Sequence, residues 1–220
     1  MSVKVDHIPI SVDSGPDAAR IRQAVAQAVC SGALSHFVFK PVYGLDDTSL
    51  EAAETLLEYF DDMGSDDSRE MLLYRLHMST RSEDPRSTLV RDAKARIAKD
   101  LSRLLKPADV DEFERQTEDL MSKAVQFWSS NMQKARAVVH IEPAMSLDPR
   151  FGPRESTDPD EKSVTLFPGI MVGETVLHEG TALWSDQKTI AAERERLGRP
   201  PLGGPPRRKL SRAQGSIRRT

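Results

Sequence analysis

The stretch from residue 84 to residue 137 constrains the fold most, because it predicts two long amphipathic helices joined at Lys106-Pro107. Asp84 and Pro85 are typical of a helix start, and Pro107 ends the first helix because proline disfavours helical geometry in the residue before it. Apolar residues recur at three- and four-residue steps in both halves, so they line one face of each helix. These residues are Leu89, Val90, Ala93, Ile97, Leu101, Leu104 and Leu105, then Val110, Phe113, Leu120, Met121, Ala124, Val125, Trp128, Met132 and Ala135.

A short connection makes neighbouring helices antiparallel, so we expect these two apolar faces to pack on each other in a shared core. Large apolar side chains carry the highest burial free energies, which favours a core over a binding face. A partner helix laid on the same stripe is the alternative. We therefore expect Leu101 and Trp128 to be buried.

Composition limits the size and the compartment of the protein. With 38% hydrophobic and 5% aromatic residues, 14 prolines and 30% charged residues, the 220-residue chain suits one domain with irregular segments. The single cysteine, Cys30, excludes a disulfide within the chain and fits a reducing compartment, where we expect it to act as a small buried hydrophobe. The first ten residues lack the apolar run of a signal peptide, and no stretch has the ~20 apolar residues of a membrane span. We expect location in the nucleus or cytoplasm and no membrane partner.

Charge is distributed unevenly along the chain. The net charge is −3, but residues 194–220 carry nine Lys/Arg and one acid, which gives +8. The rest of the chain therefore has 22 basic and 33 acidic residues, which gives −11. The sequence predicts an acidic body with a basic C-terminal tail.

Five elements are expected before the hairpin. A loosely alternating apolar run over residues 3–12, broken by Pro9, predicts a short edge strand. A helix is predicted over residues 16–30 and ends at Gly32, and residues 34–43 are either a strand or buried coil. A helix over residues 46–62 begins with a capping box of Thr48 and Glu51 and ends at Gly64, and Asp67 caps a further short helix.

The C-terminal third is predicted to be a β-region followed by irregular sequence. Residues 137–141 favour a strand, and residues 143–162 contain four prolines, which is typical of a flexible loop. Four short β-favouring runs in residues 163–184, separated by glycine-containing pairs, predict a small antiparallel meander with which Val139 pairs. A short helix over residues 186–197 ends at Gly198.

Together these elements predict an α+β, mainly α, protein with a long antiparallel helical hairpin, shorter helices, a small antiparallel β-meander and a disordered C-terminal tail. Residues 1–142 form the mainly helical region with the hairpin at 84–137. Residues 143–162 form the flexible loop, residues 163–198 pack on the helical region, and residues 199–220 form the basic tail.

The sequence contains no recognisable catalytic, cofactor or metal motif. Its five histidines lack zinc-ligand spacing, and the nucleophile elbow, the phosphate-binding loop and the dinucleotide fingerprint are missing. His140 and Glu142 share a strand face, and an enzyme site assembled from His140, Glu142 and His178 is the remaining enzymatic alternative. We assign no catalytic, cofactor-binding or metal-binding residue.

The basic tail carries the one pattern with a functional interpretation. Its cationic side chains predict a nuclear-import patch, or a nucleic-acid-binding patch that contacts phosphates without reading sequence. These residues are Arg207, Arg208, Lys209, Arg212, Arg218 and Arg219. Ser211 lies among them as a candidate phosphorylation site, where a phosphate would offset part of the positive charge. The alternative is a tail that only keeps the protein soluble.

The segments Leu166-Phe167-Pro168 and Val176-Leu177-His178-Glu179-Gly180-Thr181-Ala182-Leu183 follow a long charged helix. This arrangement resembles uncharacterised proteins of filamentous fungi over about a third of the chain. The resemblance implies no activity and no site residue.

The leading hypothesis from sequence is a non-enzymatic interaction or regulatory protein with an unidentified protein partner. In one interpretation this protein is located in the nucleus. The first alternative is weak, non-specific nucleic-acid binding through the basic tail. The second is an enzyme with a site assembled from dispersed residues.

Overall fold

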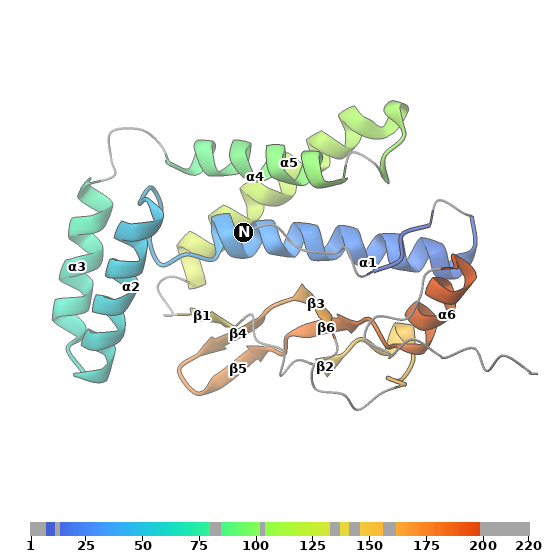
Figure 1. Cartoon of the computed structure of the whole chain (residues 1–220). Helices are drawn as coiled ribbons and strands as arrows, with labels where there is room; N and C mark the ends of the chain where they lie inside the picture. The colour runs from blue at the N-terminus through green and yellow to red at the C-terminus, as the bar shows by residue number, and fades with distance from the viewer. Residues whose placement is uncertain are drawn as a thin grey trace, which may run out of the picture.

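The computed structural model describes residues 8–11, 14–79, 85–101, 104–132, 137–140, 146–155 and 162–198. In its body, helix α1 (Pro16–Ala33) lies between a helical hairpin and the β-strands (Figure 1). The hairpin consists of α4 (Pro85–Leu101) and α5 (Val110–Phe127). A second helical pair, α2 (Asp47–Asp62) and α3 (Asp66–Ser79), stands beside the body at one end of α1. The protein is therefore α+β and mainly helical, as the sequence predicts.

Helix α1 is the central element, which the sequence did not indicate. Its apolar residues point both toward the hairpin and toward the strands, so more than one face is buried. Buried residues at three- and four-residue steps explain why this segment is helical. They are Ala18, Ile21, Ala24, Val25, Ala28, Val29 and Ala33.

The expected end of α1 at Gly32 is wrong, and so is the expected strand or buried coil for residues 34–38, whereas residues 39–43 are coil with Val42 and Tyr43 buried, as one alternative predicted. The helix continues through Ala33 and then widens into a π-helical turn, Leu34–Val38. Leu34 and Val38 stand four residues apart and are both buried in the core. Their burial outweighs both the ~1 kcal/mol helix penalty of a glycine and the strand preference of the aromatic residues.

The α4–α5 hairpin confirms the main sequence prediction. Leu101 and Trp128 are only 2% and 3% exposed, and Lys94 of α4 forms ion pairs across the interface with Glu114 and Glu118 of α5. Helix α4 ends at Leu101, earlier than expected, and a 3₁₀ turn, Pro107–Asp109, leads into α5. Helix α5 continues into a second π-helical turn, Trp128–Met132.

The four predicted strands exist, but they do not form a meander. They are β3 (Ser163–Phe167), β4 (Gly169–Val172), β5 (Thr175–His178) and β6 (Thr181–Trp184). Strand β4 pairs with β5, and β3 pairs with β6, both antiparallel. The four strands are therefore the two arms of one long hairpin that turns at Gly173-Glu174 and is interrupted at Pro168 and at Glu179-Gly180.

Two further strands extend this hairpin on opposite sides. Strand β1 (Ala137–His140) pairs antiparallel with β4, and Val139 lies opposite Ile170, which confirms the predicted pairing of Val139 with the β-region. Strand β2 (Ser146–Leu147) pairs in parallel with β6. The result is two three-stranded sheets, in the orders β1-β4-β5 and β2-β6-β3.

Residues 146–155 differ from the structureless loop that the prolines predict. After β2, a 3₁₀ turn (Pro149–Phe151) begins at Asp148, whose side chain accepts a hydrogen bond from the Arg150 backbone N–H. Phe151 is only 1% exposed and packs in the core. Burial of one large aromatic ring offsets the ordering of several backbone residues around it.

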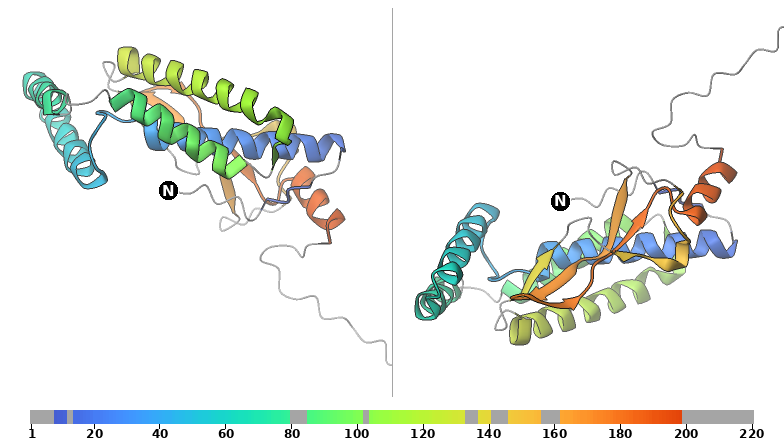
Figure 2. Two further views of the ribbon diagram at one scale, coloured as in Figure 1. Left: turned by 90° about the horizontal axis from the view of Figure 1, so that it is seen from above. Right: turned by 90° about the horizontal axis from the view of Figure 1, so that it is seen from below.

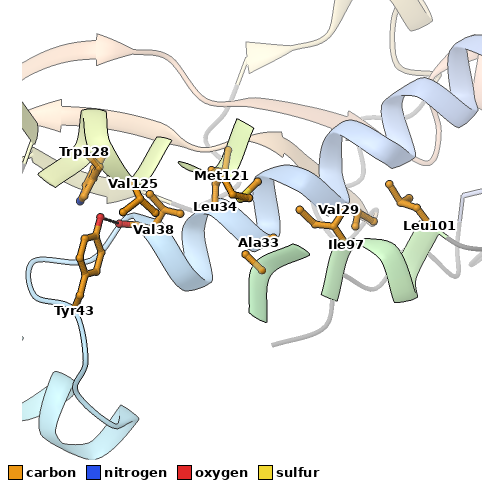
Figure 3. Packing of buried hydrophobic residues seen from close by; sticks show 11 residues of the cluster. Val29, Ala33, Leu34, Val38, Tyr43, Ile97, Leu101, Met121, Val125 and Trp128 are labelled. Atoms are coloured by element: carbon orange, nitrogen blue, oxygen red, sulfur yellow. Dashed lines mark hydrogen bonds between the residues drawn. The ribbon is translucent and has the colours of Figure 1, made fainter. Parts of the chain in front are cut away.

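The first core lies between α1, the hairpin and the π-helical turn (Figure 3). Its buried members are Val29, Ala33, Leu34, Val38, Tyr43, Ala93, Ile97, Leu101, Met121, Val125 and Trp128. The Trp128 indole N–H donates to the Lys40 carbonyl at 3.0 Å, and the Tyr43 hydroxyl donates to the Val38 carbonyl at 2.9 Å. These two bonds satisfy polar groups that core burial would otherwise leave unpaired.

The second core lies between α1, the β3–β6 sheet and α6 (Lys188–Arg196), which ends before Gly198 as predicted. Its buried members are Ile8, Ile21, Ala24, Val25, Ala28, Phe151, Val164, Leu166, Leu183 and Ile190. Ile8 belongs to the expected edge strand, but residues 8–11 are not a strand and the rest of that prediction lies outside the described residues.

We call residues 46–79, which contain α2 and α3, the arm. Figures 1 and 2 show the arm set apart from the three layers of the body. The Asp46 carboxylate accepts a hydrogen bond from the Ser49 backbone N–H at 2.8 Å, so Asp46 caps α2 and the predicted Thr48–Glu51 capping box is wrong. Helix α3 begins at Asp66, one residue before the predicted cap Asp67. Gly64, with φ of 62°, ends α2 as predicted.

No helix in the described part of the chain is both long enough and apolar enough to span a bilayer.

Candidate interaction surface

The structure does not describe the tail residues that the sequence singles out. Arg207, Arg208, Lys209, Ser211, Arg212, Arg218 and Arg219 all lie outside the described residues. Nuclear import, nucleic-acid binding and phosphorylation of Ser211 therefore stay predictions.

The dispersed histidine site receives no support from the described contacts. His140 on β1 lies opposite Gly169, and His178 on β5 lies opposite Ile170, so their backbone positions flank β4 on its two sides. Two strand spacings separate these positions by about 10 Å. The His178 ring packs edge-on against Phe167 with 4.8 Å between ring centroids, and Glu142 lies outside the described residues.

His36 lies beside a very small cavity where α1 meets α4. The cavity measures about 10 Å³, which is room for one water molecule, and Arg96 and Asp100 also line it. Burial lowers the pKa of His36, and the Arg96 Nε donates to Asp100 at 2.8 Å. The cavity is too small for a substrate, so we interpret His36 as a packing residue.

An open groove of about 500 Å³ runs between α4 and α5. It is lined by Arg86, Ser87, Val90, Arg91, Lys94, Glu118, Ser122, Val125 and Gln126. Its charges are already paired within the hairpin, because the Lys94 ammonium lies 3.0 Å from Glu118 and Arg91 lies 3.3 Å from Asp92. The groove is the surface depression between two packed helices, and its described lining residues form no anion or cation site.

Cys30 is half-buried against the first core, and burial raises the pKa of its thiol. A raised thiol pKa disfavours the nucleophilic thiolate. Across the part of the chain that the structure describes, no group of three or more His, Cys, Asp or Glu residues is arranged to hold a metal ion.

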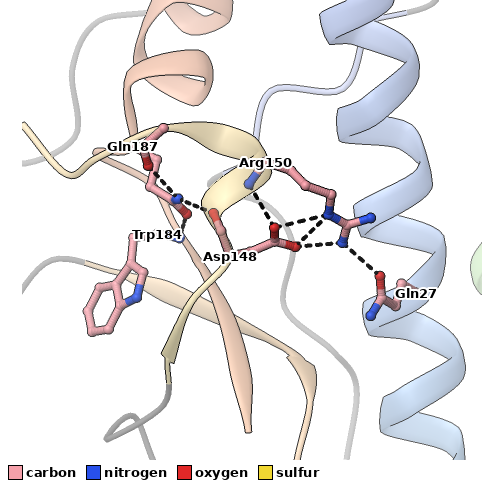
Figure 4. Close-up of polar contacts among 6 residues, drawn as sticks. Gln27, Asp148, Arg150, Trp184 and Gln187 are labelled. Atoms are coloured by element: carbon pink, nitrogen blue, oxygen red, sulfur yellow. Dashed lines mark hydrogen bonds and ion pairs between the residues drawn. The ribbon is translucent and has the colours of Figure 1, made fainter. Parts of the chain in front are cut away.

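A cluster of short polar contacts in the body joins the 146–155 segment to α1 (Figure 4). Arg150 donates to both carboxylate oxygens of Asp148, from Nε to Oδ1 at 3.0 Å and from Nη2 to Oδ2 at 2.5 Å, and Nη2 also donates to the Gln27 side-chain oxygen at 3.2 Å. Asp148 is nearly buried, and the hydrogen bonds from Arg150 lower the pKa of its carboxyl group. This geometry anchors a segment and leaves no free acid or base.

The Asp148→Asn variant tests that anchoring through its pH dependence. Because the folded-state pKa of Asp148 is depressed, its carboxylate stabilises the native protein above the ordinary pKa of about 4. That contribution is lost as the pH falls through the lower folded-state value. Urea unfolding over a pH series is therefore expected to show the native protein more stable than Asp148→Asn at neutral pH, with the difference closing in acid. Asp119→Asn, which removes an exposed ion pair with Lys123, is the control and is expected to change little. A constant difference between Asp148→Asn and the native protein at all pH values would contradict the depressed pKa.

Gln187 forms a second buried polar cluster beside the first (Figure 4). Its side-chain amide donates to the carbonyls of Asp148 and Gly152, both at 2.9 Å, and its side-chain oxygen accepts from the Trp184 backbone N–H at 2.9 Å. Nearby, Arg154 forms an ion pair with Asp186 at 3.0 Å and stacks over the Trp184 ring at 4.1 Å. These contacts connect β6, α6 and the 146–155 segment, so their function is structural.

The arm has the highest concentration of exposed large apolar side chains in the described part of the chain. Five of them are between 45% and 62% exposed: Leu56, Tyr59, Met63, Met71 and Tyr74. Elsewhere in the described residues, large exposed apolar side chains occur only as Leu120 and Phe127 on α5 and Val176 and Leu177 on β5. Clusters of exposed apolar side chains are typical of interaction sites.

Helix α2 presents three different faces along its length. The buried face is made by Leu50, Ala53 and Leu57. The exposed apolar face is made by Leu56, Tyr59 and Met63. The exposed acidic face is made by Glu51, Glu54, Glu58 and Asp62. Each set recurs at steps of three and four residues and so follows one line along the helix.

The arm is also strongly acidic. It contains ten Asp/Glu and two Lys/Arg, which gives a net charge of −8. One of the two cations, Arg69, is nearly buried and lies 3.0 Å from the Asp61 carboxylate. The exposed surface of the arm therefore combines apolar side chains with an excess of carboxylates.

Sequence reasoning identified the helices of the arm but missed this surface. The three- and four-residue spacing of Leu50, Ala53 and Leu57 is enough to indicate the buried face of α2, and all three are buried. The signal that could have identified the surface was a second line of large apolar residues, Leu56, Tyr59 and Met63. One helix face suffices for packing, so a second apolar line is available to a partner.

Comparison with known proteins finds no matching family model, no matching curated protein and no matching solved structure.

Proposed function

We propose that this chain is a non-enzymatic interaction protein that binds a partner protein through the arm. The observation that carries the proposal is the exposure of five large apolar side chains on a helical pair set apart from the body. A helical pair of this size could have packed those side chains on the body, as α4 and α5 do with most of their apolar side chains. Their exposure is the property expected of a surface that a partner covers.

The base of the arm is fixed to the body, which supports a binding role. The segment between Val38 and Asp46 is fastened by two hydrogen bonds, from Trp128 to the Lys40 carbonyl and from Tyr43 to the Val38 carbonyl. Phe39 adds a ring contact with Trp128 at 4.6 Å between centroids. A surface held at a fixed base loses less conformational entropy on binding than one on a loose tether.

The chemistry of the arm specifies the kind of partner. An apolar line beside an acidic line on α2 is complementary to a helix that has an apolar face bordered by Lys and Arg. Such amphipathic helices bind helical surfaces through apolar residues at three- and four-residue steps, and charge complementarity fixes their orientation. The proposed partner is therefore a basic amphipathic segment of another protein.

Serine replacements in the arm test this proposal. The probe is a fluorescent peptide with leucines at three- and four-residue steps and arginines between them, titrated into the full chain. Tyr59→Ser combined with Met71→Ser is expected to weaken binding of this peptide about tenfold or more, since two apolar anchors are lost. Both side chains are exposed in the free protein, so the free energy of unfolding is expected to change little.

Two controls accompany that experiment. Leu120→Ser combined with Phe127→Ser removes exposed apolar residues from α5 and is expected to leave peptide binding unchanged. A peptide with glutamates in place of arginines is expected not to bind, because the arm is acidic. Equal binding by the two serine double variants, or equal binding of the two peptides, would exclude the arm as the proposed site.

The second candidate function is nucleic-acid binding or nuclear import through the tail. It is favoured by seven Lys/Arg and no acid in residues 199–220. Contacts of this kind neutralise phosphates and weaken steeply as salt rises. A phosphate on Ser211 would oppose them by offsetting part of the local positive charge.

A further inference from the structure

We propose that the basic tail, residues 199–220, docks on the acidic arm of the same molecule and competes there with the partner. This inference rests on the proposed function of the arm and adds a means of controlling it. The tail has the same chemistry as the basic amphipathic partner that the arm surface is proposed to bind.

Charge complementarity is the first reason. The arm has a net charge of −8, and the tail has seven Lys/Arg and no acid, which gives +7. The acidic face of α2 is exposed, and apart from Arg69, which is buried, Arg75 is the only Lys or Arg in the arm. Between oppositely charged surfaces of this size, attraction acts over about 8–10 Å at physiological salt.

Apolar complementarity is the second reason. In the tail sequence Leu210, Ala213 and Ile217 stand three and four residues apart, so they would follow one line in a helix. The cations Arg208, Arg212 and Arg219 fall away from that line. The tail thus pairs an apolar line with basic positions, and α2 pairs an apolar line with acidic ones.

The tail is long enough to reach the arm. Helix α6 packs through Ile190 beside Ile21, and Arg196 donates to Ser11 at 3.0 Å, so the tail begins near the N-terminal end of α1. The arm lies at the other end of α1 (Figure 1), and the helical run Pro16 to Val38 is about 35 Å long. Ten residues separate Gly198 from Arg208, and at ~3.1 Å per residue in an extended proline-type conformation they would span about 31 Å. A helix from Arg208 to Ile217 would add about 13 Å, which brings the reach to about 44 Å.

A tethered tail reaches the arm more readily than a free partner does. A tether that spans two sites gives an effective concentration that is about millimolar. The tail is therefore expected to occupy the arm of its own molecule, and a partner must displace it. The docked tail would block the arm surface until a basic helix of higher affinity or higher concentration displaces it.

Zero-length cross-linking of the full chain tests the contact directly. Lys209 is the only lysine in the tail, and the arm has ten carboxylates but no lysine. A carbodiimide that joins amines to carboxylates in contact is expected to link Lys209 to acids of α2, among them Glu54 and Glu58. Lys209→Arg keeps the charge but removes the amine, and is expected to abolish these links.

Isotope mixing shows whether the contact is within one molecule. Light and heavy chains are cross-linked together, and links are expected within light and within heavy chains only. Mixed links between light and heavy chains, links from Lys209 to acids outside the arm, or no link at Lys209 would each overturn the proposal.

Peptide affinity separates this inference from the proposed function. Neutralising the tail with R207Q/R208Q/K209Q is expected to raise the affinity of the full chain for the Arg/Leu probe peptide about tenfold, because a competitor is weakened. R91Q/R115Q/K123Q removes the same charge from exposed positions on α4 and α5 and is expected to leave the affinity unchanged. Equal binding by the native chain and the tail variant would overturn only the inference. No binding by either chain would overturn the proposed function.

Discussion

Replacement of Trp128 by alanine is expected to lower the free energy of unfolding by about 3–5 kcal/mol, as for other large-to-small changes in packed cores. The indole ring is 3% exposed, lies against Phe39, and closes the first core where α5 meets the π-helical turn after α1. The change also removes the indole N–H that donates to the Lys40 carbonyl, and it loosens the base of the arm. Urea unfolding followed by circular dichroism measures the effect.

Phe127→Ala is the matched control for that variant. Phe127 precedes Trp128 in the chain, but its side chain is 55% exposed. We expect a change within about 0.5 kcal/mol, as for exposed positions generally. Similar losses in the two variants would contradict the orientation of α5 described above.

Replacement of Gln187 by alanine is expected to lower the free energy of unfolding by about 3 kcal/mol, although no apolar core is opened. Gln187 is fully buried, and its side chain satisfies three backbone groups: the carbonyls of Asp148 and Gly152 and the N–H of Trp184. Each group left unpaired in the interior costs about 1–3 kcal/mol, and partial access of water reduces the sum. The loss is measured by urea unfolding.

Two further variants define the cause of that loss. Gln187→Glu keeps the shape and the acceptor but cannot donate to the two carbonyls at neutral pH, so its loss is expected to be at least as large. Gln126→Ala, at an exposed position on α5, is expected to change stability by less than about 0.5 kcal/mol. A stable Gln187→Glu protein would show that the two donated bonds contribute little.

The hairpin was predictable because its apolar residues keep a helical period over many turns. Leu101 and Trp128 were expected in a shared core, and both are buried. The ends of short helices were predictable from glycines that terminate them, as at Gly64 and Gly198, where glycine adopts a positive φ. Local sequence was sufficient wherever the deciding interactions lie within a few residues.

Predictions failed where distant contacts decide the structure. Residues 34–38 favour a strand locally, yet burial of Leu34 and Val38 against the hairpin makes them helical. Residues 146–155 look irregular, yet Phe151 and the bonds to Gln187 order them. The pairing of the strands was missed because Pro168 and Gly180 resemble turns. In the structure each of them only interrupts one side of a long β-hairpin.

The candidate site was the least predictable part. The sequence directed attention to the tail and to His140, Glu142 and His178, and it treated α2 as an ordinary amphipathic helix. Which apolar line of α2 is covered depends on where the arm stands relative to the body. That position is set by the contacts of Lys40 and Tyr43, which no periodic pattern records.

Because α1 contributes side chains to both cores, the stability of the hairpin side and the stability of the strand side are coupled. We expect a substitution that weakens the hairpin side to destabilise the strand side as well through α1, and the two halves to unfold in one transition. The arm is exempt, since no residue of the arm belongs to either core in the described part of the chain. Its exposed residues are thus free to diverge under selection for a new partner, while the rest of the molecule keeps its thermal resistance.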